Sequence, residues 1–597
     1  MMKKKQKIKS CVFHNFKLTI QEIWKTSPVY LFIVIFHTLS TNLLPVASLL
    51  VMQSIINAIQ AKNIIFKTII IFVTLYVFIE IFQTLLLNLI GHYQTKFTLK
   101  FNLKIKRRIL NHAAELSLKD YENSEIYDTI QRAQYMNEGH ILTFSSQFIQ
   151  LGGAIIKLFA YSAILFELGA AILSSVLILP IIQFFVLKAI NTKEVKILQS
   201  RTEDERQSIY FSQLISNGIN YKELKLYNLF DHFISLYTDN IQEFNNQDIT
   251  LSQKKYFQSS FFSILDEIVS GLIFAYIIFL GFMGRIMLGN VITYSRSIIE
   301  AKTSVQNLFN ILAEIQRESL LLDQLFAFFD LSPSGNNMYV PEKLIEIDKI
   351  DCIELVNLSY KYRTNDQYVL KNINLKISSG ETIAILGENG SGKTTLVKII
   401  MGFYNDYEGK IYVNGIDLRN IDMQSYMKRI GALFQDFSKY EATLRENISF
   451  GNLQMMDNDA LLLETCKEFN LQEILDLDRS NINMQLGSWF RNGRQLSIGQ
   501  WQKVALARAF LKDADVYILD EPNASLDIIA EHQLTENYKK VFSGKIGIVI
   551  AHRFHQFIQS ANCIIVLKNG TLVESGTHGS LLTSGGVYAT LFYLQSN

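Results

Sequence analysis

Long apolar blocks with few charges fill the first part of this chain, up to about residue 330. A helix that crosses a membrane needs roughly 20 mostly apolar residues, because its backbone groups find no water partners in hydrocarbon. Six blocks meet or nearly meet that length, and they cover residues 28–55, 64–90, 141–166, 170–187, 257–282 and 286–312. We therefore predict an all-α transmembrane domain of six helices over residues 28–330, after an N-terminal segment of residues 1–27.

The composition agrees with a membrane domain. Of the 597 residues, 49% are hydrophobic and only 19% are charged, which is too apolar for a chain made only of soluble domains. The net charge is only +2, so no overall positive field marks a nucleic-acid binder, and we predict no nucleic-acid partner. The cysteines lack the spacing of metal ligands or of a disulfide framework, and we expect all four to be reduced: Cys11, Cys352, Cys466 and Cys563.

Basic residues predict how the helices are oriented in the membrane. Lys and Arg gather in residues 1–10, 96–108 and 188–206, and such segments stay on the cytoplasmic side. The connections between them are short and carry little positive charge. We therefore expect a multi-pass protein in contact with membrane lipid, with both termini in the cytoplasm. The sixth block is interrupted by polar residues such as Arg296, Glu300 and Lys302, so it should face protein or water rather than lipid.

The two cytoplasmic connections are long and contain almost no Gly or Pro, so we predict that they are helices extending from the membrane into water. Their turns lie at residues 121–131 and 220–230. These turns either contact a soluble domain or form ordinary helical hairpins.

The composition changes after Phe329. Residues 331–350 contain two prolines and a Gly-Asn-Asn run, which is typical of a linker. From residue 351 to 597, short β-rich strings alternate with helical patterns, as in an α/β domain with a central sheet.

A glycine-rich loop follows the strand TIAILG and precedes a predicted helix. Residues 387–394 fit the P-loop pattern G-x-x-x-x-G-K-[ST], in which backbone N–H groups and the helix N-terminus surround phosphate oxygens. Lys393 would reach the β- and γ-phosphates of ATP, and Thr394 would bind Mg²⁺. The residues that we expect at the nucleotide here are Gly387, Glu388, Asn389, Gly390, Ser391, Gly392, Lys393, Thr394 and Thr395.

Two acids end a second hydrophobic strand, residues 516–520. Parallel sheets bind ligands at the carboxyl ends of their strands, so Asp520 and Glu521 should lie near the glycine loop. Asp520 would then bind Mg²⁺, and Glu521 would orient or deprotonate the attacking water. The alternative is that the two acids merely end a strand.

Four further segments carry a family resemblance: Ser497-Ile498-Gly499-Gln500, residues 516–521, residues 524–527 and residues 550–552. Together with the glycine loop, they resemble the motifs of ATP-binding cassette transporters. Six spanning helices followed by one such domain resemble an exporter half-transporter, and the resemblance covers essentially the whole chain. It implies ATP and Mg²⁺ as cofactors and ATP hydrolysis coupled to transport.

The resemblance also implies roles for individual residues. Tyr362 would stack on adenine, although a plain strand tyrosine is the alternative. Gln435 would touch Mg²⁺ and water, and His552 would contact the γ-phosphate. Catalytic roles are thereby expected for Glu521, His552, Gln435 and Lys393, metal contacts for Thr394, Gln435 and Asp520, and further nucleotide contacts for Ser497, Gly499, Gln500 and Asp527.

The serine segment departs from the family pattern, because Ile498 stands where a glycine is usual. Ser497 and Gly499 are kept, so we expect a working site whose closure is slowed by the β-branched side chain. A glycine loop binds phosphates from one side, and the family pattern places Ser497 over the ATP of a second copy. We therefore expect a head-to-tail homodimer, with the turns at 121–131 and 220–230 as coupling helices between the domains.

Four ionisable residues fall within predicted spans: Glu80, Lys157, Asp266 and Glu267. Charges inside a membrane are costly and normally face a partner or a water-filled path. Either Lys157 pairs with one of the acids, or the acids form a cavity for a cationic cargo.

More narrowly, the strings LSLKDYENSEIYDTI, LFQDFSKYEATLRENI and QLGSWFRNGRQLSIGQWQKVALARAF resemble lantibiotic exporters of the nisin and subtilin type. That resemblance implies export of a lanthipeptide precursor across the bacterial cytoplasmic membrane, with lanthipeptide modification enzymes as partners. The roughly 27 residues before the first span are too few for a peptidase domain, as in such exporters. A multidrug or lipid exporter would share every ATP motif and remains the alternative.

Overall fold

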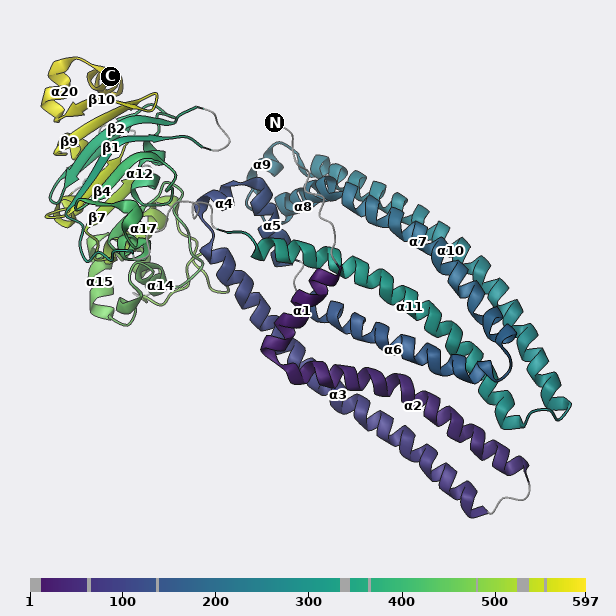
Figure 1. Ribbon diagram of the computed structural model, residues 1–597. Helices are drawn as coiled ribbons and strands as arrows, with labels where there is room; N and C mark the ends of the chain where they lie inside the picture. Colours follow the sequence, from purple (N-terminus) through teal and green to yellow (C-terminus); the bar gives the residue numbers. More distant parts are fainter. Residues whose placement is uncertain are drawn as a thin grey trace. The chain divides into compact units, whose positions relative to one another are not determined.

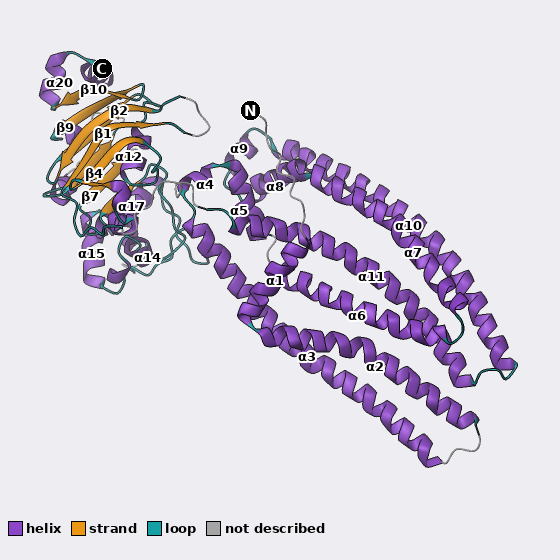
Figure 2. Ribbon diagram, viewed as in Figure 1, coloured by secondary structure: helices purple, strands orange, loops and turns teal. Residues whose placement is uncertain are grey.

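The computed structural model describes residues 12–61, 66–135, 139–332, 344–362, 367–478, 481–522, 536–551 and 556–596. The chain forms two compact units. The first comprises Met1–Glu115 and Ser124–Leu331, and the second comprises Leu116–Asn123 and Ser332–Asn597. Within the described residues the first unit is helical, and every strand belongs to the second (Figures 1 and 2).

The first unit is built from long helices that run side by side (Figure 1). Its helices are α1 (Val12–Thr26), α2 (Pro28–Gln60), α3 (Phe66–Glu115), α5 (Ser124–Tyr135), α6 (His140–Phe166), α7 (Ala170–Ser200), α8 (Thr202–Ser216), α9 (Tyr221–Leu226), α10 (Phe230–Phe282) and α11 (Leu288–Phe329). Five of the described helices contain a stretch long and apolar enough to cross a membrane, namely α2, α3, α6, α7 and α10. At about 1.5 Å per residue, α3 and α10 are roughly two and a half times as long as the ~30 Å hydrocarbon layer, so each must extend beyond it.

The sixth predicted span lies in α11, which is too polar to count among those five. This helix packs along α6 and also contacts α2 and α7. It buries Thr293, Ser297 and Ser304 against its neighbours. These buried polar side chains face protein, which is one of the two environments that the sequence predicted, whereas Arg296 on the same helix is exposed.

Ion pairs neutralise charges inside the helical unit. Lys302 Nζ lies 2.6 Å from Asp266 Oδ2, and each side chain is only 9% exposed. Lys157 pairs instead with Glu300, at 2.8 Å. Asp266 is therefore matched by a cation of its own chain, and the hypothesis of an acidic cavity containing Asp266 is not supported. The alternative that Lys157 pairs with one of the predicted acids was also wrong, because Lys157 bonds Glu300 and Lys302 on α11 supplies the charge next to Asp266.

Replacing Lys302 by Met is expected to destabilise the helical unit by about 3–5 kcal/mol, because Asp266 would stay buried without its cation. The double variant Lys302→Met/Asp266→Leu should recover most of that loss, since it removes both charges. The stability of the single and the double variant is measured in detergent by heating each sample and recording the remaining folded protein by size-exclusion chromatography. Equal melting temperatures for Lys302→Met and the wild type would show that the ion pair does not contribute to stability.

The second unit contains two sheets. Six strands form a mainly parallel sheet in the order β10-β9-β3-β8-β7-β6, in which only β10 runs antiparallel to its neighbour β9. Four strands form an antiparallel sheet in the order β2-β1-β4-β5. The strands are β1 (Cys352–Tyr360), β2 (Leu370–Ser378), β3 (Thr382–Gly387), β4 (Glu408–Val413), β5 (Ile416–Asp417), β6 (Ile430–Leu433), β7 (Val516–Asp520), β8 (Ile546–Ile550), β9 (Cys563–Lys568) and β10 (Thr571–Gly576).

Helix α12 (Lys393–Ile400) shares one hydrophobic core with both sheets. Leu396, Ile399 and Ile400 of this helix are fully buried there. A second hydrophobic core is formed by α17 and the elements packed around it. The other helices of the unit are α4 (Leu118–Glu122), α13 (Met423–Lys428), α14 (Leu444–Ser449), α15 (Asp459–Glu468), α16 (Gln472–Asp476), α17 (Ile498–Leu511), α19 (Gln556–Gln559), α20 (His578–Ser584) and α21 (Val587–Ser596), with short 3₁₀ turns η1 (Leu418–Asn420) and η2 (Leu453–Met455).

Helix α4 belongs to the second unit although its sequence lies inside the predicted transmembrane domain. Leu118 packs against the core between the sheets. Tyr404 Oη donates a hydrogen bond of 2.7 Å to Glu122 Oε1, and Lys119 forms an ion pair with Asp406. The first of the two predicted coupling turns thus divides at Ser124, where α5 returns to the helical unit.

The described cysteines Cys352, Cys466 and Cys563 are free, which confirms the expectation of reduced thiols for them. Cys11 lies outside the described residues.

Candidate active site

Three neighbouring segments meet at the carboxyl edge of the six-stranded sheet. The glycine loop follows β3, Gln435 follows β6, and Asp520 and Glu521 stand at the end of β7. Because β3, β6, β7 and β8 are parallel, their carboxyl ends lie at one edge, which is where such sheets bind ligands.

The glycine loop requires glycine at its turning points. Gly387 has φ +148° and Gly392 has φ +102°, values that L side chains rarely adopt. A Cβ atom on Gly392 would lie 2.8 Å from Leu370 Cδ2 and 2.9 Å from Val369 O. The loop can therefore approach β2 and enter α12 only without side chains at these positions.

Lys393 is the first residue of α12 and bends back over the loop. Its Nζ donates hydrogen bonds to Gly387 O (2.8 Å) and Glu388 O (3.0 Å). Burial lowers the pKa of the Lys393 ammonium, while Glu521 and Asp520 oppose that effect. Ser391 Oγ is buried and has no hydrogen-bond partner among the described residues. The loop thus presents the Lys393 cation to a phosphate group, while the Ser391 hydroxyl stays buried beside the cavity lining.

Asp520 is the last residue of β7 and is 5% exposed. Thr394 Oγ1 donates a hydrogen bond of 3.3 Å to Asp520 Oδ2. Burial, together with the neighbouring Glu521 carboxylate, raises the pKa of Asp520 to about 6. A hydroxyl and a carboxylate held together in this way are the hard oxygen ligands that Mg²⁺ prefers, so these two residues fit a magnesium site.

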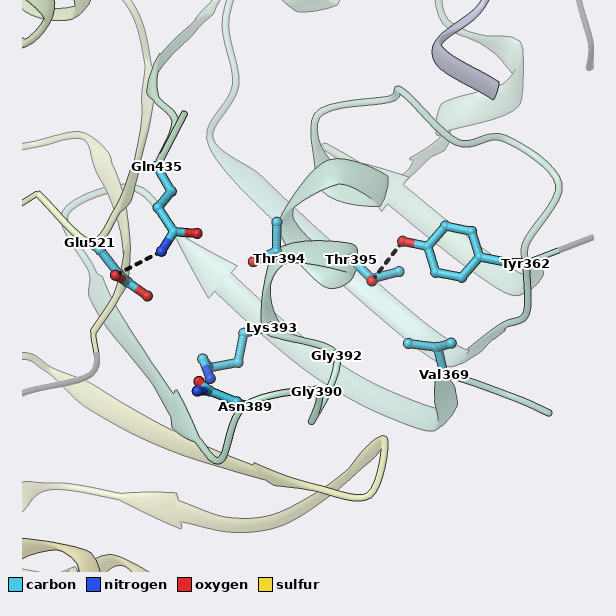
Figure 3. Close-up of a pocket in the computed structure, with 10 residues that line it drawn as sticks. All are labelled: Tyr362, Val369, Asn389, Gly390, Gly392, Lys393, Thr394, Thr395, Gln435 and Glu521. Carbon is cyan, nitrogen blue, oxygen red and sulfur yellow. Dashed lines mark hydrogen bonds between the residues drawn. The ribbon is translucent and has the colours of Figure 1, made fainter. Parts of the chain in front are cut away.

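Glu521 adopts φ +52°, a conformation that costs a non-glycine residue about 1–3 kcal/mol and that is concentrated at functional sites. Its backbone N–H donates to Ile550 O (3.0 Å), and its carboxylate Oε2 accepts a hydrogen bond of 3.0 Å from Gln435 Nε2. This bond leaves the Gln435 Oε1 oxygen available to a metal ion or water. The turn thus aims the Glu521 carboxylate towards the cavity (Figure 3).

A cavity of about 630 Å³ joins these groups. Figure 3 shows Tyr362 and Val369 at one end, Gln435 and Glu521 at the other, and the glycine loop between them. Tyr362 Oη shares a hydrogen bond of 3.0 Å with Thr395 Oγ1, which fixes the ring beside α12. An elongated cavity with an aromatic ring at one end and acids at the other matches a nucleoside triphosphate. The lining contains Tyr362, Val369, Asn389, Gly390, Gly392, Lys393, Thr394, Thr395, Gln435 and Glu521.

Replacing Tyr362 by Ala is expected to weaken ATP binding about 10-fold, because stacking of a base on an aromatic ring contributes about 1–3 kcal/mol. Tyr362→Phe should keep the affinity, since it keeps the ring. Titration with a fluorescent ATP analogue measures the difference. Tyr368→Ala, at a tyrosine outside the cavity that bonds Glu408, is the control. Unchanged affinity in Tyr362→Ala would support the alternative of a plain strand tyrosine.

Ser497, Gly499 and Gln500 do not line this cavity. Ser497 is the N-cap of α17: its Oγ accepts from Gln500 N (3.2 Å), and Gln500 Oε1 accepts from Ser497 N (3.0 Å). Ile498 is 59% exposed, so its bulk is accommodated at the surface of the chain. Within one chain the serine segment is therefore a capped helix N-terminus apart from the nucleotide cavity.

Two expected site residues, Asp527 and His552, lie outside the described residues. Sequence reasoning missed Gln502, which is 3% exposed on α17. Its Nε2 donates to Pro522 O (2.7 Å) and Glu521 O (3.3 Å), and so holds the turn that carries Glu521. Val369 was missed as well, because a valine before a strand has no distinguishing chemistry.

The raised pKa of Asp520 predicts that the stability of the metal-free protein depends on pH. Because its folded pKa of about 6 exceeds the value of 3.8 expected when unfolded, its charge destabilises the metal-free fold above pH 6, and the penalty fades as the pH falls through about 6. Asp520→Asn should therefore raise the metal-free melting temperature at pH 7.5 by about 2–4 °C, and less at pH 5. Scanning calorimetry with a chelator measures this, with the surface variant Asp457→Asn as control. An equal gain at both pH values would contradict the prediction.

Fold and site together define a P-loop nucleotide-binding ATPase joined to membrane-spanning helices. The family profile described as "ABC transporter" matches residues 370–524. The chain is 35% identical over 565 residues to the subtilin transport ATP-binding protein of Bacillus subtilis, covering 92% of this chain and 89% of that protein. It is 32% identical over 580 residues to the nisin transport ATP-binding protein of Lactococcus lactis, covering 96% and 95%.

A solved structure described as a bacterial Atm1-family ABC exporter with ATP bound has the same fold, with a TM-score of 0.78 at 19% identity, covering 95% of this chain and 97% of that one. This protein belongs to the ATP-binding cassette exporters, as a half-transporter that resembles the lantibiotic exporters. It is a multi-pass protein of the bacterial plasma membrane that binds ATP and couples ATP hydrolysis to transport. Half-transporters of this family typically function as dimers.

Proposed function

We propose that this protein exports a peptide, specifically a lanthipeptide precursor, across the bacterial cytoplasmic membrane as a homodimer. The observation that carries the proposal is the extent of similarity to the subtilin and nisin transport proteins, which spans 92% and 96% of this chain and so includes the helical unit. In contrast, a lipid A-core flippase of Neisseria gonorrhoeae matches over 58% of this chain at 29% identity. A cargo that crosses the membrane would contact the helical unit, so similarity in that unit favours peptide.

The nucleotide cavity supplies the energy. In this proposal Tyr362 stacks on adenine, and the loop N–H groups and Lys393 bind the phosphates. Thr394, Gln435 and Asp520 would hold Mg²⁺, which neutralises charge on the phosphate oxygens. Gln435 positions Glu521 through their 3.0 Å hydrogen bond, and Glu521 orients the attacking water and accepts its proton.

The second copy completes each site. Ser497 lies outside the cavity that contains Lys393 on the same chain, and the N-terminus of α17 at Ser497 offers N–H groups to an anion. In a head-to-tail dimer that helix end would face the γ-phosphate held by the partner. The turns at α4 and α9 would then pass the opening and closing of the dimer to the membrane helices.

The orientation and partners follow from the same proposal. Both termini would lie in the cytoplasm, where the basic segments stay and where ATP is available. Lanthipeptide modification enzymes would deliver the finished precursor on that side. Lipid surrounds the spanning helices, and no nucleic acid takes part.

Reconstitution tests the proposal. Inside-out proteoliposomes containing the protein are mixed with a leader-bearing lanthipeptide precursor and ATP, and peptide uptake and ATP hydrolysis are recorded together. We expect ATP-dependent uptake and stimulated hydrolysis, both lost in Glu521→Gln. The control peptide is the same precursor without its leader.

The multidrug or lipid exporter is the second candidate function. A Bacillus subtilis protein named "Putative multidrug export ATP-binding/permease protein YgaD" matches 52% of this chain at 30% identity, and the lipid A-core flippase matches a similar share of this chain at 29% identity. Stimulation of hydrolysis by a lipophilic cation or by a lipid, with no response to any precursor peptide, would replace peptide export by this function.

A further inference from the structure

The helical unit contains a second large cavity, of about 740 Å³, among α2, α3, α6 and α11. Its residues on α2 extend from Tyr30 to Asn42, a rise of about 18 Å at about 1.5 Å per residue. This distance corresponds to roughly five residues of extended polypeptide at about 3.3 Å each. The cavity lies at the end where α2 and α6 begin, next to the basic residues that predict the cytoplasmic side.

Uncharged hydrogen-bonding side chains dominate the lining. They include Asn42 on α2, Gln94 on α3, Gln150 on α6, and Asn307 and Asn310 on α11. Each carboxamide offers both donors and an acceptor. Such groups are costly to bury among membrane helices unless something satisfies them, so their concentration on one cavity indicates a polar ligand or water there.

The hydroxyl and amide groups on α2 and α6 are already oriented by their own helices. Thr41 Oγ1 donates to His37 O (2.9 Å), Asn42 Nδ2 donates to Thr38 O (2.7 Å), and Ser146 Oγ donates to Thr143 O (2.9 Å). Because both hydroxyl donors and one N–H of Asn42 are used within the helices, the side-chain oxygens remain as acceptors. A ligand with several N–H groups would fit them.

One carboxylate is present among the side chains that line the cavity. Glu314 Oε2 accepts a hydrogen bond of 2.8 Å from Gln147 Nε2, and Gln147 is only 7% exposed. The Gln147 Oε1 atom has no partner among the described residues. Glu314 is thus held in place, with its other oxygen able to receive a single cation.

We propose that this cavity binds the main chain of an extended cargo segment through its peptide N–H and C=O groups, and that Glu314 binds one Lys or Arg side chain of that segment. The inference rests on the proposed function and adds which residues recognise the cargo and how. An acyl chain would leave the carboxamides unsatisfied, whereas a peptide backbone carries donors and acceptors in equal number. Recognition of the main chain depends little on side chains.

Backbone methylation tests the proposal directly. The wild-type dimer in nanodiscs is titrated with a fluorescein-labelled peptide of about eight residues, made of Gly, Ser, Asn and one Lys, and long enough to span a cavity of roughly five residues. A second peptide carries N-methyl groups on alternate residues. We expect at least about 10-fold weaker binding of the methylated peptide, since several hydrogen bonds of about 0.5–1.5 kcal/mol each are lost. Fluorescence anisotropy without nucleotide measures both.

Variants locate the binding site. The double variant Asn307→Leu/Asn310→Leu should lower the affinity for the unmethylated peptide about 10-fold, because the same hydrogen bonds are lost. Gln306→Leu, on the same helix but outside the lining, should leave that affinity unchanged. Glu314→Gln should lower the affinity for the Lys peptide but leave the affinity for its norleucine analogue unchanged. If the double variant does not fold, the comparison of methylated and unmethylated peptides in the wild type still tests main-chain recognition.

Two outcomes overturn the inference in distinguishable ways. Equal binding of methylated and unmethylated peptides, together with ATP-driven uptake of a precursor, would reject main-chain recognition and keep peptide export. Binding of tetraphenylphosphonium or dodecyl phosphate that is lost in Asn307→Leu/Asn310→Leu, with no peptide binding, would reject both the inference and the proposed function.

Discussion

A mixed dimer of Lys393→Ala and Ser497→Asp chains should regain about half of the wild-type ATPase rate, whereas each variant alone should be nearly inactive. In a head-to-tail dimer each site uses the glycine loop of one chain and Ser497 of the other. The mixed dimer therefore contains one site with both variants and one intact site. Coexpression with two affinity tags and purification through both yields only mixed dimers, whose ATP hydrolysis is then measured.

The structure explains why Asp is the right replacement. Ser497 caps α17, and Asp caps a helix N-terminus about as well as Ser, so Ser497→Asp should keep its melting temperature. The added negative charge would instead repel a phosphate held by the partner. A mixed dimer of Lys393→Ala with a chain carrying both substitutions is the matched control, because neither of its sites is intact. Full activity of Ser497→Asp alone would falsify the shared site.

Glu521→Gln should lower ATP hydrolysis by at least about 100-fold and leave ATP affinity within about 2-fold of wild type, because a positioned general base contributes about 10²–10⁴ in rate. Gln keeps the size of the side chain and an oxygen that can accept from Gln435 Nε2, so the turn should persist. Phosphate release gives the rate, and a fluorescent ATP analogue gives the affinity. Glu464→Gln, on the exposed face of α15, is the control.

A glycine at the same position separates catalysis from folding. Glu521 has φ +52°, which glycine adopts without strain, so Glu521→Gly should be as inactive as Glu521→Gln and yet more stable by about 1 kcal/mol. A melting temperature below that of wild type would show that the Glu521 side chain stabilises the turn instead. A hydrolysis rate above half of wild type in Glu521→Gln would place the base elsewhere.

Local chemistry made much of the site predictable. The glycine loop, its lysine and the following threonine are consecutive, and their function depends on a strand before them and a helix after them, both of which have clear local patterns. Asp520 and Glu521 could be found because a run of buried residues ends there. Five predicted spans match helices long and apolar enough to cross a membrane, because lipid demands that pattern.

Contacts between distant segments could not be predicted in this way. The hydrogen bond between Gln435 and Glu521 joins residues 86 positions apart in the chain. Gln502 supports the Glu521 turn from α17, and no sequence motif marks it as a contact of that turn. The alternative that Lys157 pairs with Glu80, Asp266 or Glu267 was wrong, since the partners of Lys157 and Asp266 depend on which faces of α6, α10 and α11 meet.

By itself the sequence determined which segments can enter lipid and which loop can hold phosphate, because both depend on neighbouring residues and on rules that hold in any fold. Only the tertiary structure decided that α4 joins the nucleotide-binding unit and that four helices line a polar cavity in the helical unit. Those outcomes depend on how side chains from segments far apart in the chain pack, and no local pattern records that packing.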